Sequence, residues 1–194
     1  MNRIIKLLSI VALSSFVLAT ENTEETVVEK TTFAIENGLT GIVGPNGCGK
    51  SNIVESLRWC MGETSAKSMR GSGMEDVIFS GTSNKPSKNI AEVSIALSNN
   101  NKDGPYQYKD LDEIQIRRKI EKDKGSKFYI NDKEARAKDA QMFFADLSTG
   151  AHSPSLISQG RIGALVTAKP VDRRTILEEA AGIAGLHVRR HEAE

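Results

Sequence analysis

A glycine-rich loop at residues 44–51 constrains this chain more than any other feature of its 194 residues. The loop reads Gly-Pro-Asn-Gly-Cys-Gly-Lys-Ser and satisfies the pattern G-x-x-x-x-G-K-[ST]. A short, partly β-branched run at 39–43 precedes it and predicts a buried strand. Apolar residues at helical spacing follow, and Gly62 predicts where that helix ends. Strand, glycine loop and helix in this order are the context in which such a loop binds phosphate.

Each residue type in the loop has a chemical reason to be there. Glycines let backbone N–H groups close around phosphate oxygens without a Cβ in the way. The start of the helix adds the positive end of its dipole. Lys50 is expected to reach the β and γ phosphates, and the Ser51 hydroxyl to hold Mg²⁺. The alternative is a glycine-rich turn with an incidental lysine, which the flanking strand and helix patterns disfavour.

The first nineteen residues differ in character from the rest. Two basic residues open the chain, Leu7 to Ala19 is apolar apart from serines, and acidic residues follow. This layout is typical of a secretory signal peptide. A helix of thirteen residues is about 20 Å long and too short to span a bilayer. The alternative is a first strand or helix of the domain. We therefore predict a signal-peptide-like or aberrant segment at 1–19 and a linker at 20–28.

Composition is that of an ordinary globular domain, with 39% hydrophobic and 26% charged residues. Two cysteines exclude a disulfide scaffold. If a helix joins Cys48 and Cys60, their Cα atoms are about 18 Å apart and cannot form a bridge, so we expect two free, buried thiols. The net charge of +1 neither favours nor excludes a nucleic-acid partner, since a local basic patch can exist in a neutral total.

Beyond the loop, the pattern predicts an antiparallel β-subdomain. Residues 91–97 alternate and indicate a half-buried strand, and loosely alternating isoleucines at 114–120 indicate another. Turn residues at 124–126 and at Asn131-Asp132 predict hairpins. Residues 138–147 predict a helix, and Pro170 is expected to begin a further one.

Several blocks in order resemble the N-terminal head segment of bacterial SMC proteins, the chromosome-structuring ATPases. The first runs from Gly38 to Asn52 and continues through Arg58-Trp59 and Gly62-Glu63. Further blocks are residues 65–71, 74–79 and 156–162, with Arg173-Arg174 and 178–183. The resemblance covers residues 29 to 194. It implies an α/β fold of the P-loop NTPase class, an ABC-type ATPase half-head with an antiparallel β-subdomain at 29–185. Residues 186–194 then begin a truncated coiled coil.

The resemblance also implies a split active site. Heads of this family join an N-terminal half, which has the phosphate loop, to a C-terminal half with the signature and Walker B motifs. No segment here looks like Leu-Ser-Gly-Gly or like an apolar run ending in Asp-Glu. The implied partners are the C-terminal half, a second head in an ATP-sandwiched dimer, DNA, and a kleisin with its accessory subunits. No membrane partner is expected.

Site residues follow by matching motifs to the family. Gln159 falls at the Q-loop glutamine, which reaches Mg²⁺ and the attacking water, and Arg70 matches the arginine linked to DNA-stimulated hydrolysis. The alternatives are a solvated loop glutamine and a surface arginine. Catalytic roles are thus assigned to Lys50, Gln159 and Arg70, and metal roles to Ser51 and Gln159. The predicted ATP site is Gly44, Pro45, Asn46, Gly47, Cys48, Gly49, Lys50, Ser51 and Asn52.

A local basic excess gives a candidate DNA contact. Residues 113–138 hold nine Lys/Arg against five Asp/Glu. Arg117, Arg118 and Lys119 are the candidates for phosphate contacts, and a solvated hairpin face is the alternative. Gly73 stands where many family members carry a lysine.

The main hypothesis is an ATP-binding half-head that hydrolyses ATP only when it is completed, and that acts with DNA in the cytoplasm. One alternative is a non-catalytic remnant, truncated or exported. Another is a related repair ATPase of the RecN or RecF kind, against which the blocks at 65–79 and 173–183 argue.

Overall fold

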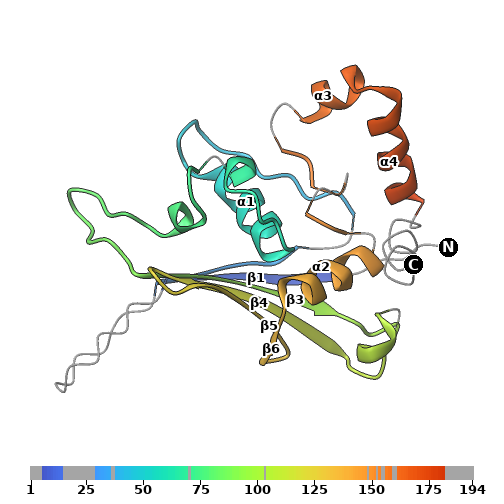
Figure 1. Ribbon diagram of the computed structural model, residues 1–194, viewed down its shortest axis with the longest axis horizontal. Coiled ribbons are helices and arrows are strands. Elements are labelled where there is room, and N and C mark those ends of the chain that lie inside the picture. The colour runs from blue at the N-terminus through green and yellow to red at the C-terminus, as the bar shows by residue number, and fades with distance from the viewer. Residues whose placement is uncertain are drawn as a thin grey trace.

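The structure of the chain is a computed structural model with side chains. It describes residues 6–14, 29–35, 38–69, 71–102, 104–147, 149–151, 153, 156–158 and 161–181. A six-stranded sheet in the order β2-β1-β3-β4-β5-β6 forms its base, and every neighbouring pair of strands is antiparallel (Figure 1). The strands are β1 Lys6–Ser14, β2 Glu29–Phe33, β3 Ile90–Ser98, β4 Glu113–Glu121, β5 Gly125–Ile130 and β6 Lys133–Ala135.

Helices α1 and α2 lie on the same side of this sheet (Figure 1). The helices are α1 Lys50–Cys60, α2 Ala137–Asp146, α3 Arg161–Thr167 and α4 Pro170–Ala180. Three 3₁₀ turns accompany them, at Lys67–Met69, Met74–Val77 and Tyr106–Tyr108. The predicted helices after the glycine loop, near 138–147 and from Pro170 are confirmed, whereas α3 was not predicted.

The core lies between the sheet and the two helices. Pairing of Ile95 with Ile116 and of Leu97 with Ile114 puts apolar residues of β3 and β4 on one face. Side chains two apart on a strand share a face, so the predicted alternation becomes the inner wall of the core. Trp59 from α1 and Phe144 from α2 are fully buried against it. Phe144 packs edge-to-face on Phe143, with 5.4 Å between the ring centroids.

Turn chemistry fixes the register of the hairpins. Asn131 and Asp132 connect β5 to β6, and both have positive φ, 48° and 62°. A two-residue turn with two positive φ angles matches the right-handed twist of the strands, and Asn and Asp tolerate this conformation well. Gly125, with φ of 80°, begins β5 directly after the turn that follows β4. The hairpin predictions are therefore confirmed.

Part of the N-terminal segment, which was predicted to be signal-peptide-like or aberrant, belongs to the sheet. Lys6–Ser14 forms strand β1, which pairs with β2 on one side and β3 on the other. The alternative interpretation, a first strand of the domain, describes this arrangement. The physical reason is that an apolar run with short serine interruptions suits an interior strand as well as a signal peptide. The predicted linker at 20–28 lies outside the described residues.

Residues 39–43 also differ from their prediction. They form no strand among the described residues, and the side chains of Leu39 and Val43 are 96% and 92% exposed. A buried strand needs neighbouring strands to satisfy its N–H and C=O groups. The six-stranded sheet does not include this segment, so no described strand satisfies its N–H and C=O groups.

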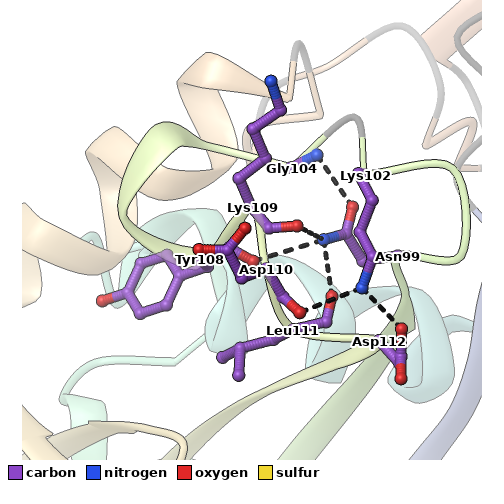
Figure 2. A network of polar contacts seen from close by, with 8 residues as sticks. All are labelled: Asn99, Lys102, Gly104, Tyr108, Lys109, Asp110, Leu111 and Asp112. Atoms are coloured by element: carbon purple, nitrogen blue, oxygen red, sulfur yellow. Dashed lines mark hydrogen bonds and ion pairs between the residues drawn. The ribbon is translucent and has the colours of Figure 1, made fainter.

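Asn99 organises the loop that connects β3 to β4 (Figure 2). Its amide nitrogen donates to the carbonyl oxygens of Tyr108, Lys109 and Leu111 at 3.2, 3.3 and 2.8 Å. Its side-chain oxygen accepts the N–H of Gly104 at 2.8 Å. One buried side chain therefore replaces the ladder hydrogen bonds that a strand would have supplied to this loop.

Asn99→Ala is expected to lower the free energy of unfolding by about 2 kcal/mol, because four partly buried backbone groups lose a partner at once. Asn100→Ala is the matched control, since Asn100 is the exposed neighbour of the same residue type. Urea unfolding of both variants measures the difference. Equal stability of the two variants would contradict the structural role of Asn99.

Candidate nucleotide-binding site

The loop at 44–49 leaves the start of α1 open toward solvent. Gly49 is the N-cap residue, with φ of 88° and no side-chain hydrogen bond to the helix. Gly47 also has positive φ, 82°, which only glycine adopts without strain. The first N–H groups of a helix have no intrahelical acceptor, and the dipole makes this end positive. The loop therefore presents backbone donors suited to an anion.

Lys50 folds back over the loop that precedes it. Its Nζ donates to the carbonyl oxygens of Gly44 and Pro45 at 2.7 and 2.5 Å. A Cβ at Gly44 would meet Cys48 Sγ at 3.0 Å, so the turn closes tightly around the lysine stem. The Lys50 ammonium thus sits beside the exposed glycine turn. This arrangement can bind phosphate through one mobile cation and several fixed amides.

Ser51 and Asn52 begin the first turn of α1. Ser51 is half-buried and Asn52 is exposed, and the Asn52 N–H donates to the Gly49 carbonyl at 3.0 Å. A hydroxyl in the first turn, next to a phosphate-binding loop, suits Mg²⁺, which prefers oxygen ligands and retains waters and substrate phosphates around it. The donor set around the loop fits a nucleotide with its magnesium ion.

Two further predicted site residues, Arg70 and Gln159, lie outside the described residues. The chain directly after Arg70 is fixed by Asp76, whose carboxylate accepts the N–H groups of Ser72 and Gly73 at 2.6 and 3.0 Å. These bonds, with Gly73 contributing most, lower the pKa of the Asp76 carboxyl. Asp76 therefore anchors the segment 72–76.

Arg118 lies in the core, which differs from its prediction as a DNA contact. Its side chain is 3% exposed and points to the helix-covered face of β4. Its Nη1 donates to the carbonyl oxygens of Trp59 and Glu63. Burial lowers the pKa of Arg118 to about 10. The sequence does contain a signal for this role. Arg118 lies two residues from both Ile116 and Ile120, so a strand places all three on the same, apolar face.

Arg117 and Lys119 lie on the opposite face of β4, as the alternation of a strand requires. Arg117 pairs with Asp132 at 3.0 Å and with Glu92 at 3.7 Å, and its guanidinium stacks 4.6 Å from the Tyr129 ring centroid. Lys119 is half-buried. The three predicted DNA residues are therefore divided between two faces, and two of them remain candidates for a surface contact.

Sequence reasoning missed a polar cluster at the end of α1. Glu63 is buried, and its carboxylate accepts the Ser65 N–H at 2.8 Å and lies 3.7 Å from Arg58. Arg58 Nε donates to the Ala151 carbonyl at 2.9 Å. The cluster joins the glycine-loop helix to the segment after α2.

The two cysteines are both free, as predicted, but only Cys60 is buried. Burial raises the pKa of the Cys60 thiol to about 12. Its Sγ contacts the carbonyl oxygens of Val93 and Ile116 at 3.4 and 3.6 Å. Cys48 is exposed within the glycine loop, which differs from the expectation of a buried thiol.

A glycine loop and its helix, packed through the helix on a mainly antiparallel subdomain, define a P-loop nucleotide-binding domain of the ABC-type ATPases. A family model described as the RecF/RecN/SMC N-terminal domain matches residues 18–160, more than half of the chain. The chain therefore belongs to the RecF/RecN/SMC N-terminal domain family.

Individual relatives point to the SMC branch of this family. The chromosome partition protein Smc of Rhodopseudomonas palustris is 56% identical over 167 residues, which are 86% of this chain and 14% of that protein. A structure described as the Smc head domain with an extended coiled coil bound to the C-terminal domain of ScpA, from Pyrococcus furiosus, has a TM-score of 0.75 at 28% identity. The match includes 97% of this chain and 45% of the chain in that structure.

A third match comes from work on ATP-driven dimerization and DNA-stimulated activation of SMC ATPases. It has a TM-score of 0.71 at 27% identity. The match includes 90% of this chain and 99% of the chain in that structure. These matches favour an SMC head segment over a repair ATPase. The chain spans about one seventh of the length of the curated relative from Rhodopseudomonas. Among the described helices, none is long and apolar enough to cross a bilayer.

Proposed function

We propose that the chain binds ATP with Mg²⁺ and forms the nucleotide-binding half of an SMC ATPase that structures chromosomes. The observation that carries this proposal is the open glycine turn at the start of α1, with Lys50 folded over it. The backbone donors of the turn would hold the phosphates, and Lys50 would move from the loop carbonyls to the β and γ phosphates. A bound Mg²⁺ would neutralise charge on the phosphates, with Ser51 as its protein ligand.

Hydrolysis needs groups that the described site does not bring together. We assign Gln159 to the orientation of the attacking water and Arg70 to charge on the transferring phosphate, both from the family resemblance. The catalytic base is expected from a Walker B segment, which has no counterpart in this sequence. The site is therefore proposed to work only when another polypeptide segment completes it.

Exposed apolar residues support a missing partner segment. Leu39 and Val43 are almost fully exposed, and Ile42 is 41% exposed, in a run whose composition suits a buried strand. We infer that the C-terminal half of the head adds strands beside this run. A second head would then close over the nucleotide, in keeping with the ATP-driven dimerization named for the related structure.

The remaining partners follow from the same relatives. A kleisin of the ScpA type is proposed because related heads are described in complex with ScpA. DNA is proposed as the polymer on which the assembly acts, with Arg117 and Lys119 as candidate contacts. Residues 186–194 are proposed to lead into the coiled coil.

We place the protein in the cytoplasm, where ATP and the chromosome are found. Removal of residues 1–19 would take away β1, the strand that pairs with both β2 and β3. This argues against export of the chain through a cleavable leader.

Equilibrium binding of a fluorescent ATP analogue tests the proposal, with and without Mg²⁺. We expect saturable binding that Mg²⁺ strengthens. Addition of the C-terminal head segment of the Rhodopseudomonas relative is expected to produce ATP turnover that neither polypeptide shows alone. No detectable binding would refute the proposed function.

A further inference from the structure

Helix α1 is attached to the sheet at one end. Its buried side chains are Leu57, Trp59 and Cys60, all within its last four residues. The loop at the other end and residues 38–43 before it are exposed. The helix has 11 residues and is about 16 Å long, so it behaves as a short rigid rod. Contacts at its C-terminal turn therefore set the direction in which the glycine loop points.

Arg118 supplies the polar part of this attachment. Its Nη1 donates to the carbonyl oxygens of Trp59 at 2.7 Å and Glu63 at 2.6 Å, where the helix ends. Its Nε donates to the Ser126 hydroxyl at 2.8 Å. Carbonyl groups at the end of a helix lack intrahelical donors, and the helix dipole there favours a cation. One side chain therefore ties α1 to both strands of the β4–β5 hairpin.

Stacking limits how this guanidinium can lie. Its central carbon is 4.5 Å from the Trp59 ring centroid and 4.6 Å from that of Phe128. A planar group between two rings, with hydrogen bonds at its edge, has little freedom to turn. Lysine keeps the charge but has neither the plane nor the fork of donors.

We propose that Arg118 is a positioning residue for nucleotide binding, which fixes the angle of α1 and so the place of Lys50 relative to the sheet. The inference rests on the proposed function. Beyond that function, it makes the affinity for the nucleotide depend on a buried residue at the end of α1 farthest from the proposed phosphate site.

The test compares Arg118→Lys with Arg136→Lys in the full chain. Arg136 is the residue before α2, and its side chain is 84% exposed in a surface ion pair with Asp139. Urea unfolding at the temperature of the binding assay first establishes that both variants are folded. Binding of the fluorescent ATP analogue with Mg²⁺ is then measured at that temperature. We expect Arg118→Lys to unfold cooperatively and to bind about tenfold more weakly, and Arg136→Lys to bind within about twofold of the unaltered chain.

A spectroscopic readout accompanies the affinity. Trp59 is the single tryptophan of the sequence, so its emission reports the contact with Arg118 directly. We expect this emission to change in Arg118→Lys and to stay the same in Arg136→Lys. An unchanged emission in Arg118→Lys would contradict the described stacking.

The possible results separate the two claims. Equal affinity of Arg118→Lys and the unaltered chain would overturn the positioning role while the proposed function stands. Absence of binding by the unaltered chain would refute the proposed function and the inference with it. If Arg118→Lys does not fold, Ser126→Ala replaces it, because it removes only the Nε bond. That variant is expected to bind about threefold more weakly, and unchanged affinity would overturn the inference.

Discussion

Lys50→Ala is expected to weaken binding of MgATP about 100-fold. The ammonium of Lys50 is the cation beside the open glycine turn, and it already bonds two loop carbonyls there. On a bound nucleotide it would form charge-assisted hydrogen bonds to phosphate oxygens, each about 1.5–3 kcal/mol. A loss of about 3 kcal/mol corresponds to roughly two powers of ten in the dissociation constant. Isothermal titration or fluorescence binding measures it.

The matched control for this loss is Lys109→Ala. Lys109 is exposed in the loop between β3 and β4, and only its backbone carbonyl takes part in the Asn99 network (Figure 2). Removal of this charge leaves the glycine loop intact, so affinity is expected to stay within about twofold of the unaltered chain. A Lys50→Ala variant that binds as tightly as Lys109→Ala would contradict the assigned site.

Phe144→Ala is expected to lower the free energy of unfolding by about 3–5 kcal/mol. The ring is fully buried between α2 and the sheet and packs edge-to-face on Phe143. Truncation removes apolar contact area and leaves a cavity that neighbours fill only in part. Domains are stable by about 5–15 kcal/mol, so this loss is a large share of the total. Urea unfolding with an unchanged m-value measures it.

Phe79→Ala serves as the control for Phe144→Ala. The same atoms are removed, but the Phe79 side chain is 39% exposed. We expect the free energy of unfolding to fall by clearly less in this variant, by about 1 kcal/mol. Similar losses at the two positions would show that the interface between α2 and the sheet is not the core described above.

Local sequence patterns predicted the helices and turns that depend on interactions between residues close together in the chain. The helix after the glycine loop follows from apolar spacing that ends at a glycine, and Gly62 has the expected positive φ of 103°. The hairpin at Asn131-Asp132 follows from residues that tolerate such angles. The glycine turn before α1 also follows from the motif, whose Gly47 and Gly49 both have positive φ.

Features that depend on contacts between distant parts of the chain could not be predicted from local sequence patterns. Lys6–Ser14 has the composition of a signal peptide, and its strand role depends on β2 and β3, which lie far along the chain. Arg118 was grouped with its basic neighbours because they are adjacent in the sequence, whereas a strand places adjacent residues on opposite faces. Its partners Trp59 and Glu63 are more than fifty residues away. The exposed run at 39–43 depends on strands that no described residue supplies.

Steady-state ATP hydrolysis by this chain on its own tests the central claim most directly. The glycine loop is proposed to bind the nucleotide, and the base and the signature motif are expected from other segments. The prediction is therefore binding of MgATP without hydrolysis above the rate in buffer. Sustained turnover by the isolated chain that disappears in Lys50→Ala would contradict the account, because the active site would then be complete within these residues.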